Sequence, residues 1–192
     1  VFAIDGAAQL SGNYSMMNRA IDNTVAVPDK FTEQLSDFVN QYFELKNSLV
    51  KSDFQLTQTN TKKLETIFNK IDMKLLDEEA HSMWMEQYSK LKKDIGQLQT
   101  AKDIEKQREL FSAISNQIIE TVETFGLIIE TVYVAYCPMA LGDKGAYWLS
   151  EIEEINNPYF GNKMLRCGEV KKKIKKKGKQ ETKTNQSQGH QH

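Results

Sequence analysis

The sequence predicts a mainly α protein, an antiparallel up-down four-helix bundle that carries a small C-terminal β-hairpin and loop appendage. Apolar residues recur at helical spacing in four successive segments between residues 28 and 126. The links between these segments are short, and short links place neighbouring helices antiparallel. From residue 127 to 170 the pattern changes to β-branched and aromatic residues separated by glycines. We therefore expect one domain with a helical part and a strand-rich part.

Length and composition favour a soluble globular protein with one domain plus extensions. The chain has 192 residues, of which 40% are hydrophobic and 27% are charged, and this length can bury a core without a metal or a disulfide. No apolar run is long enough to span a bilayer, and the start of the sequence lacks the basic and apolar regions of a signal peptide. Because the first residue is Val1 and not methionine, we expect a mature protein or a fragment of a longer one.

Four helices account for residues 28–126. Pro28 suits the first turn of a helix, and Asp53 offers an N-cap for the second. The third helix is expected to start at about Glu78, and the fourth starts after Thr100 and stops at Gly126. Each helix has one apolar face, which a four-helix core would bury. The four faces consist of Phe31, Leu35, Phe38, Val39, Tyr42, Phe43 and Leu49; Leu56, Leu64, Ile67, Phe68 and Ile71; Met83, Trp84, Tyr88, Leu91, Ile95 and Leu98; and Ile104, Gln107, Phe111, Ile114, Ile118, Val122 and Phe125.

The appendage begins with a predicted hairpin. Residues 128–136 are rich in β-branched and aromatic side chains, which is typical of a strand. A glycine-rich turn follows, and residues 146–149 are expected to return as the second strand. A short helix is expected over residues 151–155, and a last strand or short helix over residues 164–174.

Both ends of the chain are expected to lie outside the helical core. Residues 1–27 are expected to be extended, because no sustained helical stripe runs through them. Residues 171–192 form a lysine-rich tail that we expect to be disordered. Such a run can make weak contact with the phosphates of an anionic membrane. Without aromatic residues among the lysines, it is not expected to bind nucleic acid.

Four sulfur-bearing residues are the candidate metal ligands: Cys137, Met139, Met164 and Cys167. Thiolate and thioether sulfurs prefer soft ions such as Cu(I) or Ag(I) and hold hard ions poorly. Zinc is less favoured, because the sequence has no Cys-x-x-Cys pair and no histidine close to either cysteine. Two other interpretations stay open. The two cysteines form a disulfide, or they are buried thiols that pack as small apolar groups.

His81 is an additional candidate ligand, because Met83 and Met85 follow it closely. The alternative is a surface or interface residue at the start of a helix, with Met83 in the core. No phosphate-binding loop or nucleophile elbow is present. An enzyme that used Cys137 would have only His81 as a base in the folded part. We therefore expect a protein that is not an enzyme.

Five blocks of the sequence carry a resemblance to a known family. They are Ala80-His81-x-x-Trp84-Met85, Gln107-Arg108-x-x-Phe111, Tyr136-Cys137-Pro138-Met139-Ala140, Gly145-Ala146-x-Trp148-Leu149-Ser150 and Asn157-Pro158-Tyr159-Phe160-Gly161-x-x-Met164-Leu165-x-Cys167-Gly168. Over roughly residues 28–170 the chain resembles the bacterial domain of unknown function 3347. Members occur alone as exported proteins, or as the C-terminal extension of periplasmic adaptors (membrane fusion proteins) of copper/silver-type heavy-metal efflux systems. Residues 1–12 also look like the closing segment of such an adaptor.

The resemblance implies a periplasmic location and a place in heavy-metal efflux. Together with the four sulfur-bearing residues, this context favours an accessory domain that binds or hands on Cu(I) or Ag(I) through those residues. The implied partners are components of the efflux adaptor and of an RND-type transporter. The alternative is a protein-interaction module that docks on the adaptor or transporter without a metal, with both cysteines structural. An oxidising periplasm also favours a disulfide.

Overall fold

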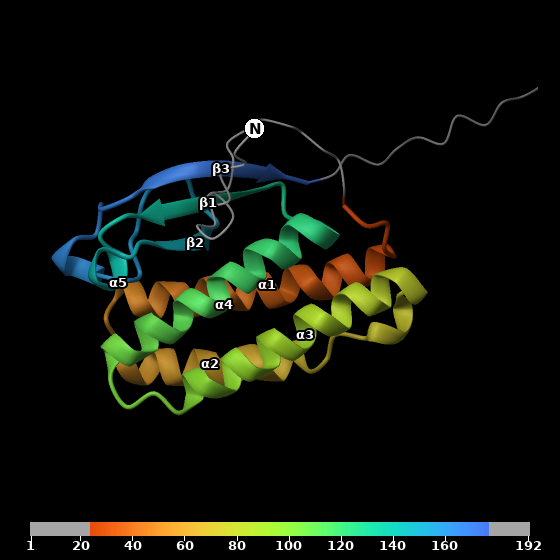
Figure 1. The fold of residues 1–192 in the computed structure, drawn as a ribbon, viewed down its shortest axis with the longest axis horizontal. Helices are drawn as coiled ribbons and strands as arrows, with labels where there is room; N and C mark the ends of the chain where they lie inside the picture. The colour runs from red at the N-terminus through yellow and green to blue at the C-terminus, as the bar shows by residue number, and fades with distance from the viewer. Residues whose placement is uncertain (1–23, 177–192) are drawn as a thin grey trace, which may run out of the picture.

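The computed structural model describes residues 24–176 of the chain. This part is mainly helical and has a small three-stranded antiparallel sheet at its C-terminal end, as the sequence predicts (Figure 1). No helix within this range is long and apolar enough to cross a bilayer. Most of the segment expected to be extended (1–27), and the lysine-rich tail from residue 177 onward, lie outside the described residues.

Four long helices and one short 3-10 helix form the helical part (Figure 1). They are α1 (Asp29–Val50), α2 (Phe54–Phe68), η1 (Met73–Leu75), α3 (Glu78–Gln99) and α4 (Ile104–Phe125). Asp53, Asp77 and Asp103 cap α2, α3 and α4, because each carboxylate accepts a hydrogen bond from the backbone N–H three residues later. Gly126, with a φ of 74°, follows the last turn of α4. The predicted helices are thus present, with α4 starting a few residues later than Thr100.

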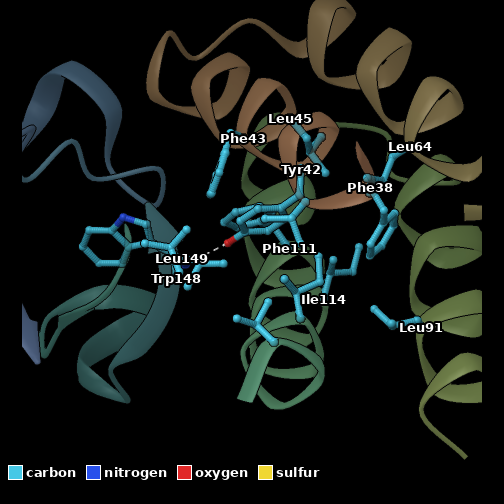
Figure 2. Packing of buried hydrophobic residues seen from close by; sticks show 14 of the residues in the cluster. Phe38, Tyr42, Phe43, Leu45, Leu64, Leu91, Phe111, Ile114, Trp148 and Leu149 are labelled. Carbon is cyan, nitrogen blue, oxygen red and sulfur yellow. Dashed lines mark hydrogen bonds between the residues drawn. The ribbon is translucent and has the colours of Figure 1, made fainter. Parts of the chain in front are cut away.

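The helical core contains two groups of aromatic side chains. Trp84 on α3 meets Phe31 and Phe125 edge-to-face, with ring centroids 5.3 and 5.9 Å apart. Tyr42 on α1 stacks on Phe111 of α4, with centroids 5.3 Å apart (Figure 2). Successive long helices pack against one another and α1 also contacts α4, so the four predicted apolar faces share one core.

The sheet consists of β1 (Thr131–Cys137), β2 (Ala146–Ser150) and β3 (Glu169–Lys175), in the order β2-β1-β3. Both outer strands run antiparallel to β1, and Tyr136 of β1 pairs with Tyr147 on one side and Glu169 on the other. A register shift at Val134 and Ala135 interrupts the pairing of β1 with β3. β2 lies nearest to the helices and packs on α4, whereas β3 lies farthest from them (Figure 1). The first two strands match the predicted hairpin.

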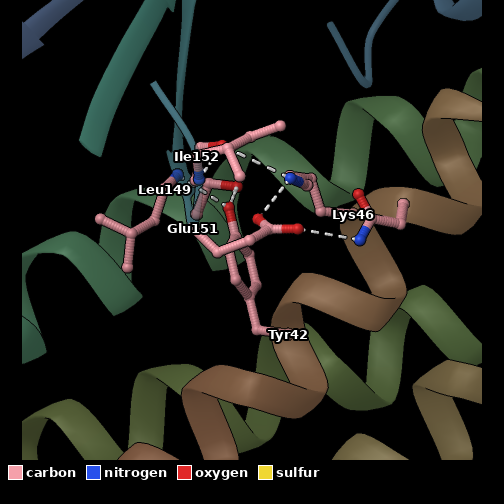
Figure 3. Close-up of polar contacts among 8 residues, drawn as sticks. Tyr42, Lys46, Leu149, Glu151 and Ile152 are labelled. Atoms are coloured by element: carbon pink, nitrogen blue, oxygen red, sulfur yellow. Dashed lines mark hydrogen bonds and ion pairs between the residues drawn. The ribbon is translucent and has the colours of Figure 1, made fainter. Parts of the chain in front are cut away.

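A partly buried ion pair between Lys46 and Glu151 shapes the chain after β2, where the sequence predicts a short helix over residues 151–155. That prediction is wrong, because residues 151–154 form bends. The Glu151 carboxylate accepts hydrogen bonds from Lys46 Nζ at 2.6 Å and from Asn47 Nδ2 at 3.0 Å (Figure 3). Burial lowers the pKa of Lys46, and the Glu151 carboxylate opposes this in part. Burial alone would raise the pKa of Glu151, but the Lys46 ammonium and the two hydrogen bonds bring it below its usual value.

Strand β3 runs through lysines that the sequence assigns to a disordered tail. Strand β3 (Glu169–Lys175) matches the last strand expected over residues 164–174, although it starts later. Residues 171–175 lie in this strand, so the expected start of the disordered tail at residue 171 is wrong. Ion pairs join Lys172 to Glu123 at 2.9 Å and Lys173 to Glu153 at 2.6 Å. Exposed pairs of this kind stabilise a fold little, but they partly offset the repulsion among the neighbouring lysines of β3 itself.

The hydroxyl group of Tyr42 joins α1, α4 and the sheet. The Tyr42 side chain has no exposed surface. Its hydroxyl oxygen lies 2.8 Å from Ser115 Oγ on α4 and accepts a hydrogen bond from the Leu149 N–H on β2 at 3.1 Å (Figure 2). Since β2 is an edge strand, its outer N–H groups need partners outside the sheet. Burial raises the pKa of Tyr42 well above its usual value.

We predict that Tyr42→Phe lowers the free energy of unfolding by about 1 to 2 kcal/mol, because the Ser115 hydroxyl and the Leu149 N–H lose their buried partner. The pH profile of stability gives a second readout. Above about pH 10 the unfolded chain releases a tyrosine proton that the folded protein retains, so stability falls as the pH rises. This fall should be shallower in Tyr42→Phe than in the unmodified protein.

Urea unfolding followed by circular dichroism between about pH 7 and 11 measures both effects. Tyr88→Phe is the matched control, because the Tyr88 hydroxyl makes one long hydrogen bond of 3.4 Å at the surface. It should change stability by less than about 0.5 kcal/mol. An equal loss in the two variants, or an unchanged alkaline slope in Tyr42→Phe, contradicts the role assigned to Tyr42.

Candidate functional site

Two cysteine thiols meet where β1 ends and β3 begins. Cys137 is the last residue of β1, and Cys167 lies just before β3. Their Sγ atoms are 3.0 Å apart and both thiols are free. A disulfide bond is about 2.05 Å long, so no bond joins the two sulfurs in this structure. The antiparallel pairing of β1 with β3 explains the meeting, because it sets the end of one strand beside the start of the other.

The two thiols differ in exposure. Cys137 is fully buried among core residues, whereas Cys167 is partly exposed. The hydrogen bond with Cys137, together with burial, raises the pKa of the Cys167 thiol to about 11. Cys167 is therefore protonated at neutral pH. From 3.0 Å the two sulfurs must approach to form a disulfide, and they must move somewhat apart to hold a soft metal ion between them.

Asn157 holds the loop that carries Cys167. Its side chain has no exposed surface, and its Nδ2 donates a hydrogen bond to the Cys167 carbonyl at 2.7 Å. Its Oδ1 accepts from the Tyr159 N–H at 2.8 Å, and its backbone N–H donates to the Leu165 carbonyl at 2.9 Å. Every hydrogen bond therefore ties one part of the loop to another. An asparagine before a proline signals side-chain hydrogen bonds to the local backbone, and this pattern at Asn157 is the sequence signal for the anchor.

Arg108 on α4 fastens the same loop to the helices. The guanidinium group is almost fully buried. Its Nε donates to the Pro158 carbonyl at 3.1 Å, and its Nη2 donates to Ser52 Oγ at 2.8 Å. A salt bridge of 2.8 Å to Glu105 offsets its charge. The sequence signal for this role is a cationic residue, Arg108, placed next to the apolar face to which Phe111 belongs.

Gly168 lets the loop lie against the sheet. Its φ of 131° suits glycine alone. A Cβ at this position would come within 2.8 Å of the Tyr136 carbonyl oxygen and 3.0 Å of the Trp148 ring. The close approach of backbone to backbone brings Cys167, the preceding residue, down to the end of β1.

The two methionines flank the thiol pair in sequence. Met139 precedes the short turn α5 (Ala140–Asp143) and is 48% exposed, and Met164 follows η2 (Gly161–Lys163) and is partly buried. Neither thioether forms an interaction with a thiol among the contacts of the described residues. Residues 24–176 contain no cluster of three or more His, Cys, Asp or Glu side chains that could hold a metal ion. The two thiols are thus the soft donors that the structure brings together.

His81 lies in the first turn of α3, which packs on α2, α4 and η1. α3 is on the side of the helices that faces away from the sheet (Figure 1). The structure therefore does not bring His81 to the thiols. Met83 is 39% exposed, so the expectation that it belongs to the core is wrong.

The fold and the thiol pair define a mainly helical domain with a small sheet that presents two adjacent soft donors. Residues 38–130 match the model of a family described as "Protein of unknown function (DUF3347)", which supports the resemblance to that family. The matched residues run from within α1 to the end of the helical part, so both cysteines lie beyond them. No curated protein and no solved structure matches the chain.

We predict that Asn157→Ala lowers the free energy of unfolding by about 2 to 3 kcal/mol and loosens the Cys167 loop, because it removes two buried side-chain hydrogen bonds. The rate at which a thiol reagent labels the reduced native protein should rise several-fold, since local opening then exposes Cys137 more often. Labelling with iodoacetamide, followed by peptide mass spectrometry, measures the rate at each cysteine.

Asn156→Ala is the matched control, because Asn156 makes one exposed hydrogen bond to Arg166. Its labelling rates should equal those of the unmodified protein. Equal rates in Asn157→Ala as well would show that Asn157 does not hold the loop.

Proposed function

We propose that this protein is a periplasmic accessory domain of a heavy-metal efflux system and that it binds or hands on Cu(I) or Ag(I) through Cys137 and Cys167. The observation that carries the proposal is the distance of 3.0 Å between the two Sγ atoms. Two sulfur donors side by side suit soft monovalent ions, which accept few ligands and prefer thiolate. Met139 and Met164 are the proposed thioether ligands that complete the set.

The described residues fit a soft ion better than a hard one. The described residues contain no group of three or more His, Cys, Asp or Glu side chains. Mg²⁺ and Ca²⁺ need several oxygen donors, and a structural zinc site usually has four cysteine or histidine ligands. Binding requires both thiols to lose their protons, so the ion displaces the protons of Cys137 and Cys167. The bound monovalent ion would offset one of the two negative charges on the thiolates.

The unequal exposure of the thiols suggests how an ion is handed on. Cys167 is partly exposed and can meet a donor or acceptor protein, whereas Cys137 is sealed in the core. Exchange of an ion between proteins needs a ligand that both proteins can reach. Cys167 is the ligand proposed for this exchange, and Cys137 is proposed to retain the ion between exchanges.

The location and partners follow from the resemblance stated above. The periplasm, an efflux adaptor and an RND-type transporter are the proposed context, with weak contact of the lysine-rich tail with an anionic membrane. The proposed role is one of binding and not of enzymatic catalysis or nucleic-acid recognition. We also infer an up-down-up-down order for the four long helices, because the connections of residues 51–53 and 100–103 are short.

A second candidate function is a protein-interaction module in which the cysteines are structural. A groove between α1 and α2 favours it, since its volume of about 590 Å³ can accept side chains of a partner. The groove is lined by Gln34, Asp37, Asn40, Gln41, Glu44, Ile67 and Lys70. In this case the domain would dock on an adaptor or transporter without any ion.

We predict that the reduced protein takes one Cu(I) per chain from a competing chelator. Cys137→Ser and Cys167→Ser should each weaken Cu(I) binding by about 100-fold or more, because one of two thiolate ligands is lost. Met139→Leu and Met164→Leu should weaken it less, since a thioether is uncharged. Titration against bicinchoninate, followed by its absorbance, measures the affinities.

His81→Ala is the matched control, and its affinity should be unchanged because α3 lies away from the thiols. Cu(I) affinity that stays the same in both serine variants would remove Cys137 and Cys167 as ligands. That result would leave the interaction module as the better explanation.

A further inference from the structure

We propose that Cys137 and Cys167 also form a redox-active pair that reacts with an external disulfide, with Cys167 as the entry thiol and Cys137 as the resolving thiol. The bond that results would occupy both soft donors and close the site to the metal. This inference adds a regulation to the proposed function. Only its metal-exclusion step rests on that function.

The distance between the sulfurs supports bond formation without rearrangement of the fold. The Sγ atoms lie 3.0 Å apart, about 1 Å more than a disulfide bond. Side-chain rotation or a small shift of the loop can close such a gap. The register of β1 against β3 and the close approach at Gly168 hold the two backbones together before any bond forms.

The difference in exposure assigns the two roles. A disulfide-containing reagent or protein must reach a thiol from solvent, and Cys167 is the partly exposed one. Cys137 has no exposed surface, so a solvent-borne partner does not reach it in the folded protein. Cys137 does reach Cys167, because the two sulfurs are already in contact. The buried thiol therefore serves the second step and not the first.

The two steps balance as ordinary thiol–disulfide exchange. The small fraction of Cys167 that has given its proton to solvent attacks one sulfur of the external disulfide. The external S–S bond breaks, and one external thiolate leaves and takes up a proton. Cys137 then attacks Cys167 Sγ, the mixed disulfide breaks, and the second external thiol leaves. Two cysteine thiols have become one disulfide, and the external disulfide has become two thiols.

The loop anchors keep the exchange local. Asn157 and Arg108 attach the loop to itself and to α4 through buried hydrogen bonds. A disulfide between Cys137 and Cys167 would link the end of β1 to the loop before β3. These two segments are already in contact, so neither helices nor strands need to move. The bond would constrain the unfolded chain across the intervening residues, and the unfolding midpoint should rise by roughly 10 °C.

The test is to treat the reduced full chain with oxidised glutathione, quench it by alkylation and measure intact mass. The protein without substitutions should become lighter by two hydrogen atoms, about 2 Da, because one disulfide forms, and it should retain no glutathione. Cys137→Ser should accumulate one glutathione on Cys167, because no resolving thiol is present. Cys167→Ser should stay unmodified until it is unfolded, because its remaining thiol is sealed.

Several outcomes would overturn the proposal. If the protein without substitutions keeps two free thiols after treatment with oxidised glutathione, it has no redox-active pair. If the two serine variants accumulate equal amounts of glutathione adduct, the assignment of entry and resolving thiols is refuted. The metal-exclusion step is tested separately by adding Cu(I) and bicinchoninate to the oxidised protein, which should bind none. Reduced protein that also binds no Cu(I) would refute the metal function, while the mass measurements would still decide the redox pair.

Discussion

The attachment of the β2 edge to the helices through Tyr42 is the contact on which the rest of the structure depends. A strand at the edge of a sheet has N–H groups that no other strand satisfies. The Tyr42 hydroxyl accepts one of them and at the same time contacts Ser115. One helical turn further along α1, Lys46 binds Glu151 and draws in the chain that follows β2. These two contacts set β2 on the helices, and β1 and β3 follow by strand pairing.

Sequence periodicity was sufficient to predict the helices and the first hairpin, because these elements depend on residues a few positions apart in the sequence. The aspartate caps and the glycine after α4 are local signals of the same kind. The segment after β2 could not be predicted in this way. Glu151 starts a helix-like pattern, but its carboxylate pairs with Lys46, which lies far away in sequence and close in space. A last strand or short helix was predicted over residues 164–174, but its boundary with the lysine-rich tail was set too early. The partners of its lysines, Glu123 and Glu153, come from other parts of the chain.

The candidate site shows the same division between local and distant information. The sequence indicated that Cys137 and Cys167 were of interest, but only pairing of β1 with β3 could bring them together. His81 was a reasonable ligand by residue type, but α3 lies on the side of the helices that faces away from the sheet and its two thiols. The anchors Asn157 and Arg108 make a stable platform out of a loop. Metal or redox chemistry on a loop needs such support, because unsupported loops sample many geometries.

The strand order also has a consequence for how the protein is made. β1 is the central strand, but one of its two partners, β3, consists of the last residues of the described part. During synthesis the N-terminal part of the chain appears first. Strand β1 can therefore pair with β2 early, but it can pair with β3 only after the last residues of the sheet have been made. During that interval Cys137 lacks both its cover and its partner thiol. A nascent chain is therefore most vulnerable to wrong disulfides with other proteins at this stage, and rapid completion of the sheet protects it.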